Sequence, residues 1–337
     1  MSEKVGFDLH LGFDISPEEM NLSPGEFWFG SLRNVVDIKG SLGKLGKLVF
    51  SNLRVIWYDE SSKQYNISVG LGLITTISVK ETKLDGNTSK FKLHLRVLSN
   101  NQRYEFLFES ERVQQNPFDN LNVIHRAYEV SMDYRNVKIR GMIMKGDSLI
   151  LLDQEKIIHQ HTNIWNLAKQ DEKLGKFYFT NIRVIWVSNV NPKFNISIPY
   201  VQMAQIKQQD SKFGPVLYIK TKRNSGGYVI GFKCENLDEI YGQVDSLYGS
   251  FSNSPNMGIP KDLLEGYAVE EVDVEEDLFA DTEIVESAYN ENQNLRALYA
   301  VDDKTDRHIV FNEEIGVSME ALPEGLSVKQ LWQILKF

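Results

Sequence analysis

The stretch "GKLVFSNLRVIWYDESSKQYNIS" at residues 46–68 decides the fold, because it occurs again as "GKFYFTNIRVIWVSNVNPKFNIS" at residues 175–197. The two stretches align without a gap at a constant offset of 129 positions, and 11 of the 23 pairs are identical. Glu26 and Glu155 keep the same offset upstream, so the repeated unit is longer than the quoted stretch. A period far above the roughly 20–50 residues of solenoid units predicts two whole domains in tandem.

Composition and length agree with a globular chain of two domains. The chain has 337 residues, of which 42% are hydrophobic and 11% aromatic, enough to fill two cores. The N-terminal residues contain no apolar run long enough for a signal peptide, and no segment has the roughly 18 apolar residues of a membrane span. Cys234 is the only cysteine, which favours a reducing compartment. We therefore expect a cytoplasmic protein.

The order of predicted elements is the same in both copies. Residues 7–110 form short alternating runs separated by Gly, Asn, Asp and Ser, which predicts a series of strands. A helix capped by Asn116, with Pro117 at its first position, is expected next, and its apolar face is Phe118, Leu121, Ile124, Tyr128 and Met132. The second copy also ends in a helix, with a predicted capping box of Asn236 and Glu239 and an apolar face at Leu237, Ile240, Val244 and Leu247.

The repeats divide the chain into four parts. We predict a first domain at residues 1–138, a second at 139–252, an acidic linker at 253–285 and a C-terminal segment at 286–337. The fold class is mainly β with α (α+β), in which each domain is a sheet followed by its C-terminal helix. The C-terminal segment is short for an independent fold, so we expect it to pack on another surface.

Each quoted stretch predicts a β-hairpin with a tight corner. We expect the corner at Ser-Asn or Thr-Asn, because Asn52 and Asn181 tolerate the left-handed conformation and can bond their own backbone. Alternation along the outgoing strand puts Trp57 and Trp186 in equivalent positions, where both indole rings are expected to anchor a core.

The pattern Gly-Lys-x-x-Phe-[Ser/Thr]-Asn-x-Arg-Val-Ile-Trp, followed by Asn-Ile-Ser, resembles the tandem pleckstrin-homology-like repeats of the Bardet-Biedl syndrome protein five family of BBSome subunits. The segments "VIHRAYE", "DSKFG", "SGGYVIGFK" and "LWQILK" extend the resemblance along the chain. The hairpin alone also resembles the GRAM branch of the same superfold. The resemblance implies two PH/GRAM-like bent β-barrels, each a seven-stranded sheet with one open end closed by a helix.

In that superfold phosphoinositide headgroups bind beside the first hairpin, so the resemblance implies lipid sites at the basic residues there. The residues expected to contact lipid are Lys44, Lys47, Arg54, Lys173, Lys176 and Arg183. Glycines in the first loop would let backbone N–H groups approach an anion. The residues alone leave an alternative open, in which the two arginines brace the hairpins against Glu26 and Glu155.

Residues 262–283 hold ten Asp or Glu and no Lys or Arg. Like-charged runs are usually solvated, but apolar residues are interleaved here, which indicates docking. We expect this segment and the C-terminal segment to bind neighbouring subunits through Leu263, Tyr267, Leu278, Phe279 and Trp332. A competing hypothesis is that the acidic run folds back over the basic hairpins and suppresses lipid binding.

The sequence contains no catalytic or metal-binding pattern. The six histidines are scattered, and His159 and His161 lack a second cluster that would complete a zinc site. Removing the ten acidic charges of residues 262–283 from the net charge of −9 leaves +1, without the basic stripe that nucleic-acid binding requires. We expect no enzyme activity, no cofactor, no metal and no nucleic-acid partner.

The leading hypothesis is a non-catalytic subunit of the BBSome, a ciliary cargo-trafficking coat. The resemblance implies three kinds of partner: other BBSome subunits, a small GTPase that recruits the complex, and membranes bearing phosphoinositides, with phosphatidylinositol 3-phosphate favoured. It implies a peripheral location at the cilium, the ciliary membrane and the basal body. The alternative hypothesis is a protein-only interaction scaffold whose barrels bind no lipid.

Overall fold

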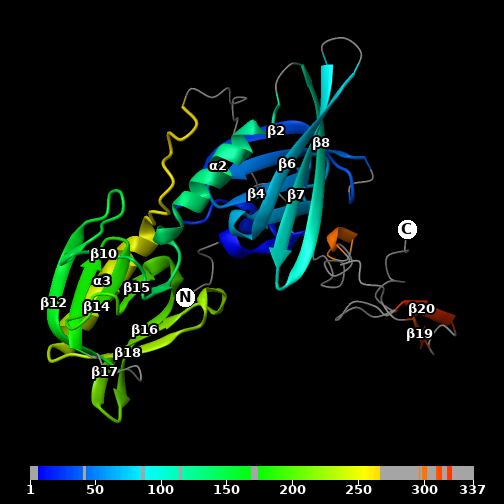
Figure 1. Ribbon diagram of the computed structural model, residues 1–337. Helices are drawn as coiled ribbons and strands as arrows, with labels where there is room; N and C mark the ends of the chain where they lie inside the picture. Colours follow the sequence, from blue (N-terminus) through cyan, green and yellow to red (C-terminus); the bar gives the residue numbers. More distant parts are fainter. Residues whose placement is uncertain are drawn as a thin grey trace. The chain divides into compact units, whose positions relative to one another are not determined.

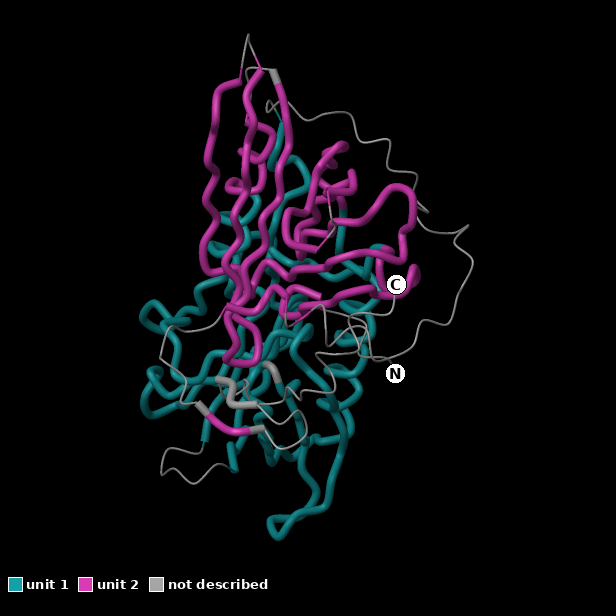
Figure 2. Tube along the Cα trace, turned by 90° about the vertical axis from the view of Figure 1, so that its right-hand side faces the viewer, with its two compact units in different colours: residues 1–6, 22–27, 124–265 teal, residues 7–21, 28–123, 266–337 magenta. Residues whose placement is uncertain are grey.

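The computed structural model describes residues 7–40, 43–84, 88–113, 116–167, 174–265, 296, 298–301, 309–312 and 317–320. These residues fall into two compact units, coloured separately in Figure 2. Unit 1 contains residues 22–27 and 124–265, and unit 2 contains residues 7–21, 28–123 and the described residues after 295. Each unit contains one large antiparallel sheet, and several strands of both sheets are labelled in Figure 1.

The large sheet of unit 2 has eight strands in the order β1-β5-β4-β3-β2-β8-β7-β6. Their bounds are β1 Leu11–Phe13, β2 Trp28–Asp37, β3 Leu45–Ser51, β4 Arg54–Asp59, β5 Asn66–Gly70, β6 Ile74–Lys83, β7 Thr88–Ser99 and β8 Gln102–Val113. The remaining elements before the second copy are α1 Pro17–Met20, α2 Asp119–Val130 and 3-10 turns at Phe7–Leu9, Leu71–Leu73 and Met132–Tyr134. Near the C-terminus β19 and β20 pair as a separate hairpin, Ile309–Asn312 with Val317–Glu320.

The large sheet of unit 1 has the same strand order, read from its other end as β9-β15-β14-β13-β12-β18-β17-β16. Its strands are β9 Lys138–Ile139, β12 Ile157–Asn166, β13 Leu174–Thr180, β14 Arg183–Ser188, β15 Asn195–Pro199, β16 Met203–Ser211, β17 Gly214–Thr221 and β18 Val229–Lys233. The other elements are β10 Met144–Lys145, β11 Ser148–Leu149, α3 Leu237–Asn253 and 3-10 turns at Tyr200–Gln202 and Arg223–Ser225.

The identical strand orders confirm the predicted repetition of one β fold followed by a helix. Each sheet has eight strands where the resemblance implied seven, because a short strand, β1 or β9, pairs with the edge of β5 or β15. The domain boundaries at residues 138 and 252 stay a prediction.

The long strand that opens each sheet is bent at the same place in both copies. β2 changes register against β3 twice, the second time between Leu32 and Val35, and β12 changes register against β13 at the positions 129 residues later. Asn34 and Asn163 lie within these second irregularities, with φ of 57° and 60°. A left-handed asparagine at a bulge bends the strand and increases its twist, which helps a flat sheet curve around a core.

The hairpin corner is closed by a hydroxyl group. Ser51 Oγ accepts hydrogen bonds from the backbone N–H groups two and three residues later, at 3.1 and 2.9 Å, and Thr180 Oγ1 accepts the equivalent pair at the same distances. The tight corner forms where it was predicted, but neither Asn52 nor Asn181 has a positive φ, so the left-handed conformation that asparagine tolerates is not used. The side-chain oxygen satisfies two backbone donors, and the turn then needs no left-handed residue.

Trp57 and Trp186 anchor the two cores in equivalent surroundings, as predicted. Each side chain is 3% exposed. Trp57 Nε1 donates to the carbonyl of Val35 at 2.9 Å, and Trp186 Nε1 donates at 3.1 Å to the carbonyl of Ile164, which lies 129 positions later. A Cβ added to Gly46 would lie 2.5 Å from Trp57 Cε2, so the absence of a side chain there makes room for the indole.

A compensated exchange beside the hairpin shows how the two cores diverged. In unit 2 Val49 and Tyr58 pack in one cluster, and in unit 1 the equivalent positions hold Tyr178 and Val187. The tyrosine has moved from one strand of the hairpin to the other. Because the pair keeps the same combined volume, the exchange preserves the packing of the hairpin.

The two long helices begin close to the predicted positions but differ in detail. α2 begins two residues after Pro117, and the N–H group of Phe118 donates to Asn116 Oδ1 at 3.0 Å. Met132 lies beyond the end of α2 and is 41% exposed, so its predicted place on the apolar face is wrong. Asn236 is the N-cap of α3 without a side-chain capping bond, so the predicted capping box does not form.

Candidate functional site

The hairpin arginine of the second copy is buried in an ion pair. Arg183 Nε and Nη2 donate to Glu155 Oε1 and Oε2 at 2.8 and 2.9 Å, and the two side chains are 1% and 0% exposed. The guanidinium also donates to the carbonyl of Ile150 at 3.0 Å and to Ser197 Oγ at 3.2 Å. Arg183 therefore braces the hairpin against Glu155, which is the alternative to lipid contact that the sequence left open. A phosphate could reach this guanidinium only after the ion pair had opened.

The hairpin arginine of the first copy caps a short helix. Arg54 is 0% exposed and donates to the carbonyls of Glu19 and Asn21 at 2.6 and 2.8 Å. These carbonyls lie at the C-terminal end of α1, where helix carbonyls have no partner within the helix. The guanidinium also lies over the ring of Phe7, 4.1 Å from its centroid. The pairing of Arg54 with Glu26 stays a prediction.

The lysines near the hairpins differ in their exposure. Lys47 is buried at 5% exposure, whereas Lys176 is exposed. The side chain of Lys44 is 50% exposed, with its Nζ 3.2 Å from Asp59 Oδ2. Lys173 lies outside the described residues. Among the predicted lipid contacts that the structure describes, only Lys44 and Lys176 are therefore exposed.

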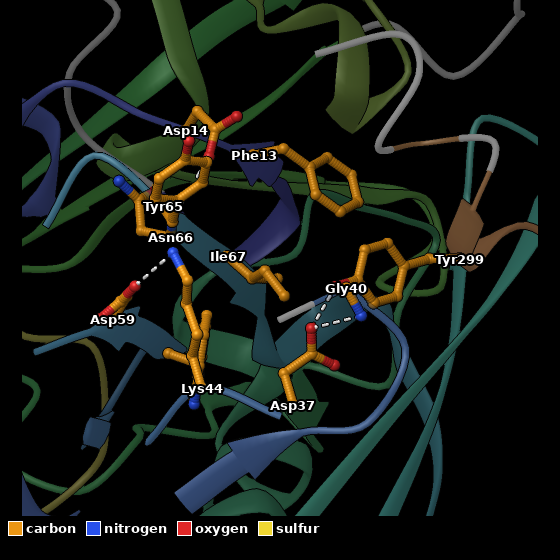
Figure 3. A pocket seen from close by; sticks show the side chains of 11 residues that line it. Phe13, Asp14, Asp37, Gly40, Lys44, Asp59, Tyr65, Asn66, Ile67 and Tyr299 are labelled. Carbon is orange, nitrogen blue, oxygen red and sulfur yellow. Dashed lines mark hydrogen bonds and ion pairs between the residues drawn. The ribbon is translucent and has the colours of Figure 1, made fainter. Parts of the chain in front are cut away.

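Lys44 lies in the wall of a pocket of about 160 Å³ within unit 2 (Figure 3). Asp14, Asp37 and Asp59 contribute three carboxylates to the wall, and Lys44 is the only basic side chain among the lining residues that the structure describes. The other lining residues are Phe13, Gly40, Trp57, Tyr65, Asn66, Ile67 and Tyr299.

The described lining residues of this pocket carry a net negative charge. Burial would raise the pKa of Asp59, but hydrogen bonds from Ser61 and the ion pair with Lys44 outweigh it and leave the pKa below its usual value. Asp59 is therefore ionised at neutral pH. An incoming phosphate would meet its negative charge beside the lysine that already neutralises it, so the pocket suits a cationic or neutral polar group better than a headgroup phosphate.

Sequence reasoning missed the three pocket aspartates and Tyr299. Asp37 and Asp59 end β2 and β4, and Asp14 follows β1 directly. The signal was present, because each aspartate terminates an apolar strand, and the bent sheet brings these strand ends together. Tyr299 carried no such signal, since its partners are almost the whole chain away in sequence.

The residues predicted to bind neighbouring subunits are mostly beyond the described part of the chain. Leu263 is half-buried in unit 1. The others lie outside the described residues: Tyr267, Leu278, Phe279 and Trp332. Their role in subunit docking stays a prediction.

Residues with possible chemistry elsewhere are occupied or inert. Within the described ranges, no group of three His, Cys, Asp or Glu could hold a metal ion. His161 Nε2 lies 2.7 Å from Gln243 Oε1 on α3. Burial raises the pKa of the Cys234 thiol to about 11, so it stays protonated and weakly nucleophilic at neutral pH. Of the helices that the structure describes, none is long and apolar enough to cross a bilayer.

Both modules match models of known protein families. Residues 26–130 match the Bardet-Biedl syndrome 5 protein N-terminal PH-like domain, and residues 138–261 match the second PH-like domain of the same protein. Among solved structures, the Vps36 N-terminal PH domain is similar at 12% identity with a TM-score of 0.29, covering 35% of this chain and 97% of that chain.

Relatives align along nearly the whole chain. The BBSome complex member BBS5 of Danio rerio is 35% identical over 338 residues, covering 97% of each chain, and that of Homo sapiens is 35% identical over 336 residues with the same coverage. The BBSome complex member bbs-5 of Caenorhabditis elegans is 30% identical over 357 residues, covering 98% of this chain and 97% of the relative.

Proposed function

Because the chain belongs to the BBS5 family of BBSome complex members, we propose that it is a non-catalytic BBSome subunit that supports transport of membrane proteins to and from cilia. The observation that supports this most strongly is 35% identity over 97% of the chain and of its relatives. The similarity covers both modules and the acidic and C-terminal segments, so every part expected to contact a partner has a counterpart. As a subunit, the chain would act at the ciliary membrane and basal body, where a small GTPase recruits the whole complex.

The subunit's first role is to be a scaffold. Arg54 and Arg183 fasten the hairpins from inside, which gives each module a rigid framework. The acidic linker and the C-terminal segment supply the apolar groups that would dock on neighbouring subunits: Leu263, Tyr267, Leu278, Phe279 and Trp332. Rigid modules joined to docking segments suit a protein that holds other subunits in place.

Its second role is to read phosphoinositide membranes, and we assign this role to the lysines and not to the arginines. Lys44 and Lys176 are exposed beside equivalent hairpins, and Lys173 adds a third charge in the second copy. A lysine near an anionic membrane surface contributes about 1 kcal/mol. Two weak sites on one chain would then act together.

A second candidate function is a protein-only scaffold, and the acidic pocket favours it. Asp59 neutralises Lys44 at 3.2 Å, so the first copy presents little free positive charge to a phosphate. In that case the modules contact only other subunits, and other BBSome members provide any membrane contact.

Liposome flotation of the full-length chain separates these two functions. Vesicles of phosphatidylcholine with and without phosphatidylinositol 3-phosphate are compared, using the wild type and a variant with Lys44, Lys173 and Lys176 changed to alanine. Removing three lysines at about 1 kcal/mol each should weaken phosphoinositide-dependent binding by about a hundredfold.

The control removes the same total charge from elsewhere, by changing Lys83, Lys145 and Lys233, which are all exposed, to alanine. It should float like the wild type. If the wild type does not float, or if all three proteins float equally, the lysines do not read phosphoinositide and the protein-only function is retained.

A further inference from the structure

A short piece of the C-terminal segment is packed into unit 2, where it appears in orange beside β8 in Figure 1. Tyr299 is its anchor, with a side chain that is 1% exposed. Its ring stacks on those of Phe13 and Phe106, with centroids 5.3 and 4.8 Å away. Arg296 holds the other end of the piece, where Nη2 donates to the carbonyl of Leu11 at 3.0 Å. The piece thus spans from β1 to β8.

The space between Phe13 and Phe106 that holds the Tyr299 ring is called the slot, and the tyrosine hydroxyl has a specific partner inside it. It donates to Asp37 Oδ2, which also accepts from the N–H group of Gly40 at 2.9 Å (Figure 3). Burial raises the pKa of Tyr299, and the neighbouring Asp37 raises it further, so the hydroxyl keeps its proton and remains the donor. A phenylalanine in the slot would leave Asp37, which is 0% exposed, without this bond.

The backbone of the piece extends the sheet. β2 pairs with Glu109 and Phe108 of β8, and the N–H group of Ile38 donates to the carbonyl of Leu107 at 2.8 Å, so among the described residues the β2 side reaches back along β8 to Leu107. Ala300 forms an antiparallel bridge with Tyr104, and the N–H group of Val301 donates to the carbonyl of Arg103 at 2.8 Å. Addition of an extended segment to a sheet edge is a common mode of peptide recognition.

The second copy does not have this slot. Phe13 pairs with Ile67, and Ile139 pairs with Ile196, which lies 129 positions after Ile67. Ile139 is therefore the counterpart of Phe13 in the second copy. Ile139 is 44% exposed, whereas Phe13 is 3% exposed. Asn166 takes the place of Asp37, and Ile230 takes the place of Phe106. The shared framework therefore folds without the two rings and the aspartate, and in the first copy all three contact the docked segment.

We propose that the module of unit 2 is a peptide-docking module, and that its resident ligand is the described part of the C-terminal segment at residues 296 and 298–301 of the same chain. The slot between Phe13 and Phe106 takes a tyrosine ring, Asp37 takes the hydroxyl, and β8 takes the backbone. The site is selective for unmodified tyrosine, because a phosphate would add a charge of about −1.5 to −2 against a buried carboxylate. The proposal depends on neither membrane binding nor complex membership.

Gly40 provides a variant that blocks the slot without altering the ligand. A Cβ at this position would overlap the tyrosine hydroxyl and lie 3.0 Å from Tyr299 Cζ, and the φ of Gly40 is not left-handed, so the backbone accepts alanine. The test is tryptic cleavage after Arg296 in full-length wild type, Gly40→Ala and Tyr299→Ala. Cleavage follows the population of the open state. We expect it to be about tenfold faster or more in both variants, since Tyr299→Ala removes the anchoring ring and Gly40→Ala excludes it from the slot.

Cleavage after Arg223, which is exposed in unit 1, serves as the internal reference and should not change. Equal cleavage after Arg296 in the wild type and both variants would overturn the proposal. So would a wild-type rate that depends on protein concentration, because the segment would then dock on a second copy of the chain.

A labelled peptide of residues 294–303 tests the specificity in trans. It should bind full-length Tyr299→Ala, whose slot is empty, but neither the wild type nor the Tyr299→Ala, Gly40→Ala double variant. The phenylalanine form of the peptide should bind about tenfold more weakly, and the phosphotyrosine form should not bind. Equal binding of the three peptides, or no binding to Tyr299→Ala, contradicts a tyrosine-selective site.

Discussion

Replacing Arg183 with methionine is expected to lower the free energy of unfolding of the second module by about 3–5 kcal/mol, because it leaves the buried Glu155 carboxylate without its guanidinium. Hydrogen exchange of the β14 amides reports this loss separately from the first module. A double variant with Glu155→Leu should recover part of the loss, since a buried ion pair can be replaced by apolar side chains at little cost. Recovery would identify the unpaired charge as the cause.

Lys176→Met is the matched control for this variant. The lysine lies on β13 of the same hairpin but is exposed, so its replacement should change stability by less than about 0.5 kcal/mol. An Arg183→Met protein that is as stable as this control would show that the guanidinium is not a brace. Contact of Arg183 with lipid would then again be the favoured explanation.

Replacing Trp57 or Trp186 with alanine is expected to destabilise the module that contains it by about 3–5 kcal/mol, and the two losses should be equal within about 1 kcal/mol. Both indoles are 3% exposed, and both N–H groups donate to a carbonyl at equivalent positions. Each variant loses the same buried ring and the same hydrogen bond, and each leaves the same cavity. Hydrogen exchange of the β4 and β14 amides measures each module by itself.

Trp165→Ala is the control for the indole variants. Trp165 lies on β12 but is 46% exposed, so its removal should cost much less than removal of Trp186 from the same module. A large loss in one copy and a small loss in the other would mean that the two tryptophans do not play the same part. The two modules would then not share one framework.

The strands and their repetition could be predicted because they depend on local pattern. Alternation marked the runs that became β1 to β8, and the constant offset of 129 positions carried the same prediction into the second copy. Residues 129 positions apart have equivalent neighbours in the two copies. The equivalence of Trp57 and Trp186 therefore followed from the alignment alone. Tertiary partners were not needed for any of these steps.

The details that failed depend on choices that the pattern does not specify. Asparagine tolerates a left-handed backbone at a corner and at a bulge alike, and here Asn34 and Asn163 take it at the bulge. A short polar run at the corner also suits closure by a hydroxyl, which is how Ser51 and Thr180 close the turn. The sequence identified the right residue types but not which of them would adopt each conformation.

The site was harder to predict than the fold because charge in a sequence does not reveal burial. Lys and Arg before and within a hairpin are typical of an anion site. The same side chain can instead point into the core, where a buried acceptor forms hydrogen bonds with it. Glu155 does this for Arg183, and the end of α1 does it for Arg54. The Tyr299 slot could not be predicted at all, because it joins residues that are separated by 262 positions in the chain, Asp37 and Tyr299.

Co-purification from ciliated cells that lack their own copy of this subunit tests the central claim, that the chain is a BBSome subunit. The tagged wild type should recover other BBSome subunits. A variant with alanine at Leu263, Tyr267, Leu278, Phe279 and Trp332 should lose them, while alanine at Met142 and Val190, which are 96% and 74% exposed, should not. A folded wild-type chain that recovers no BBSome subunit would contradict the account.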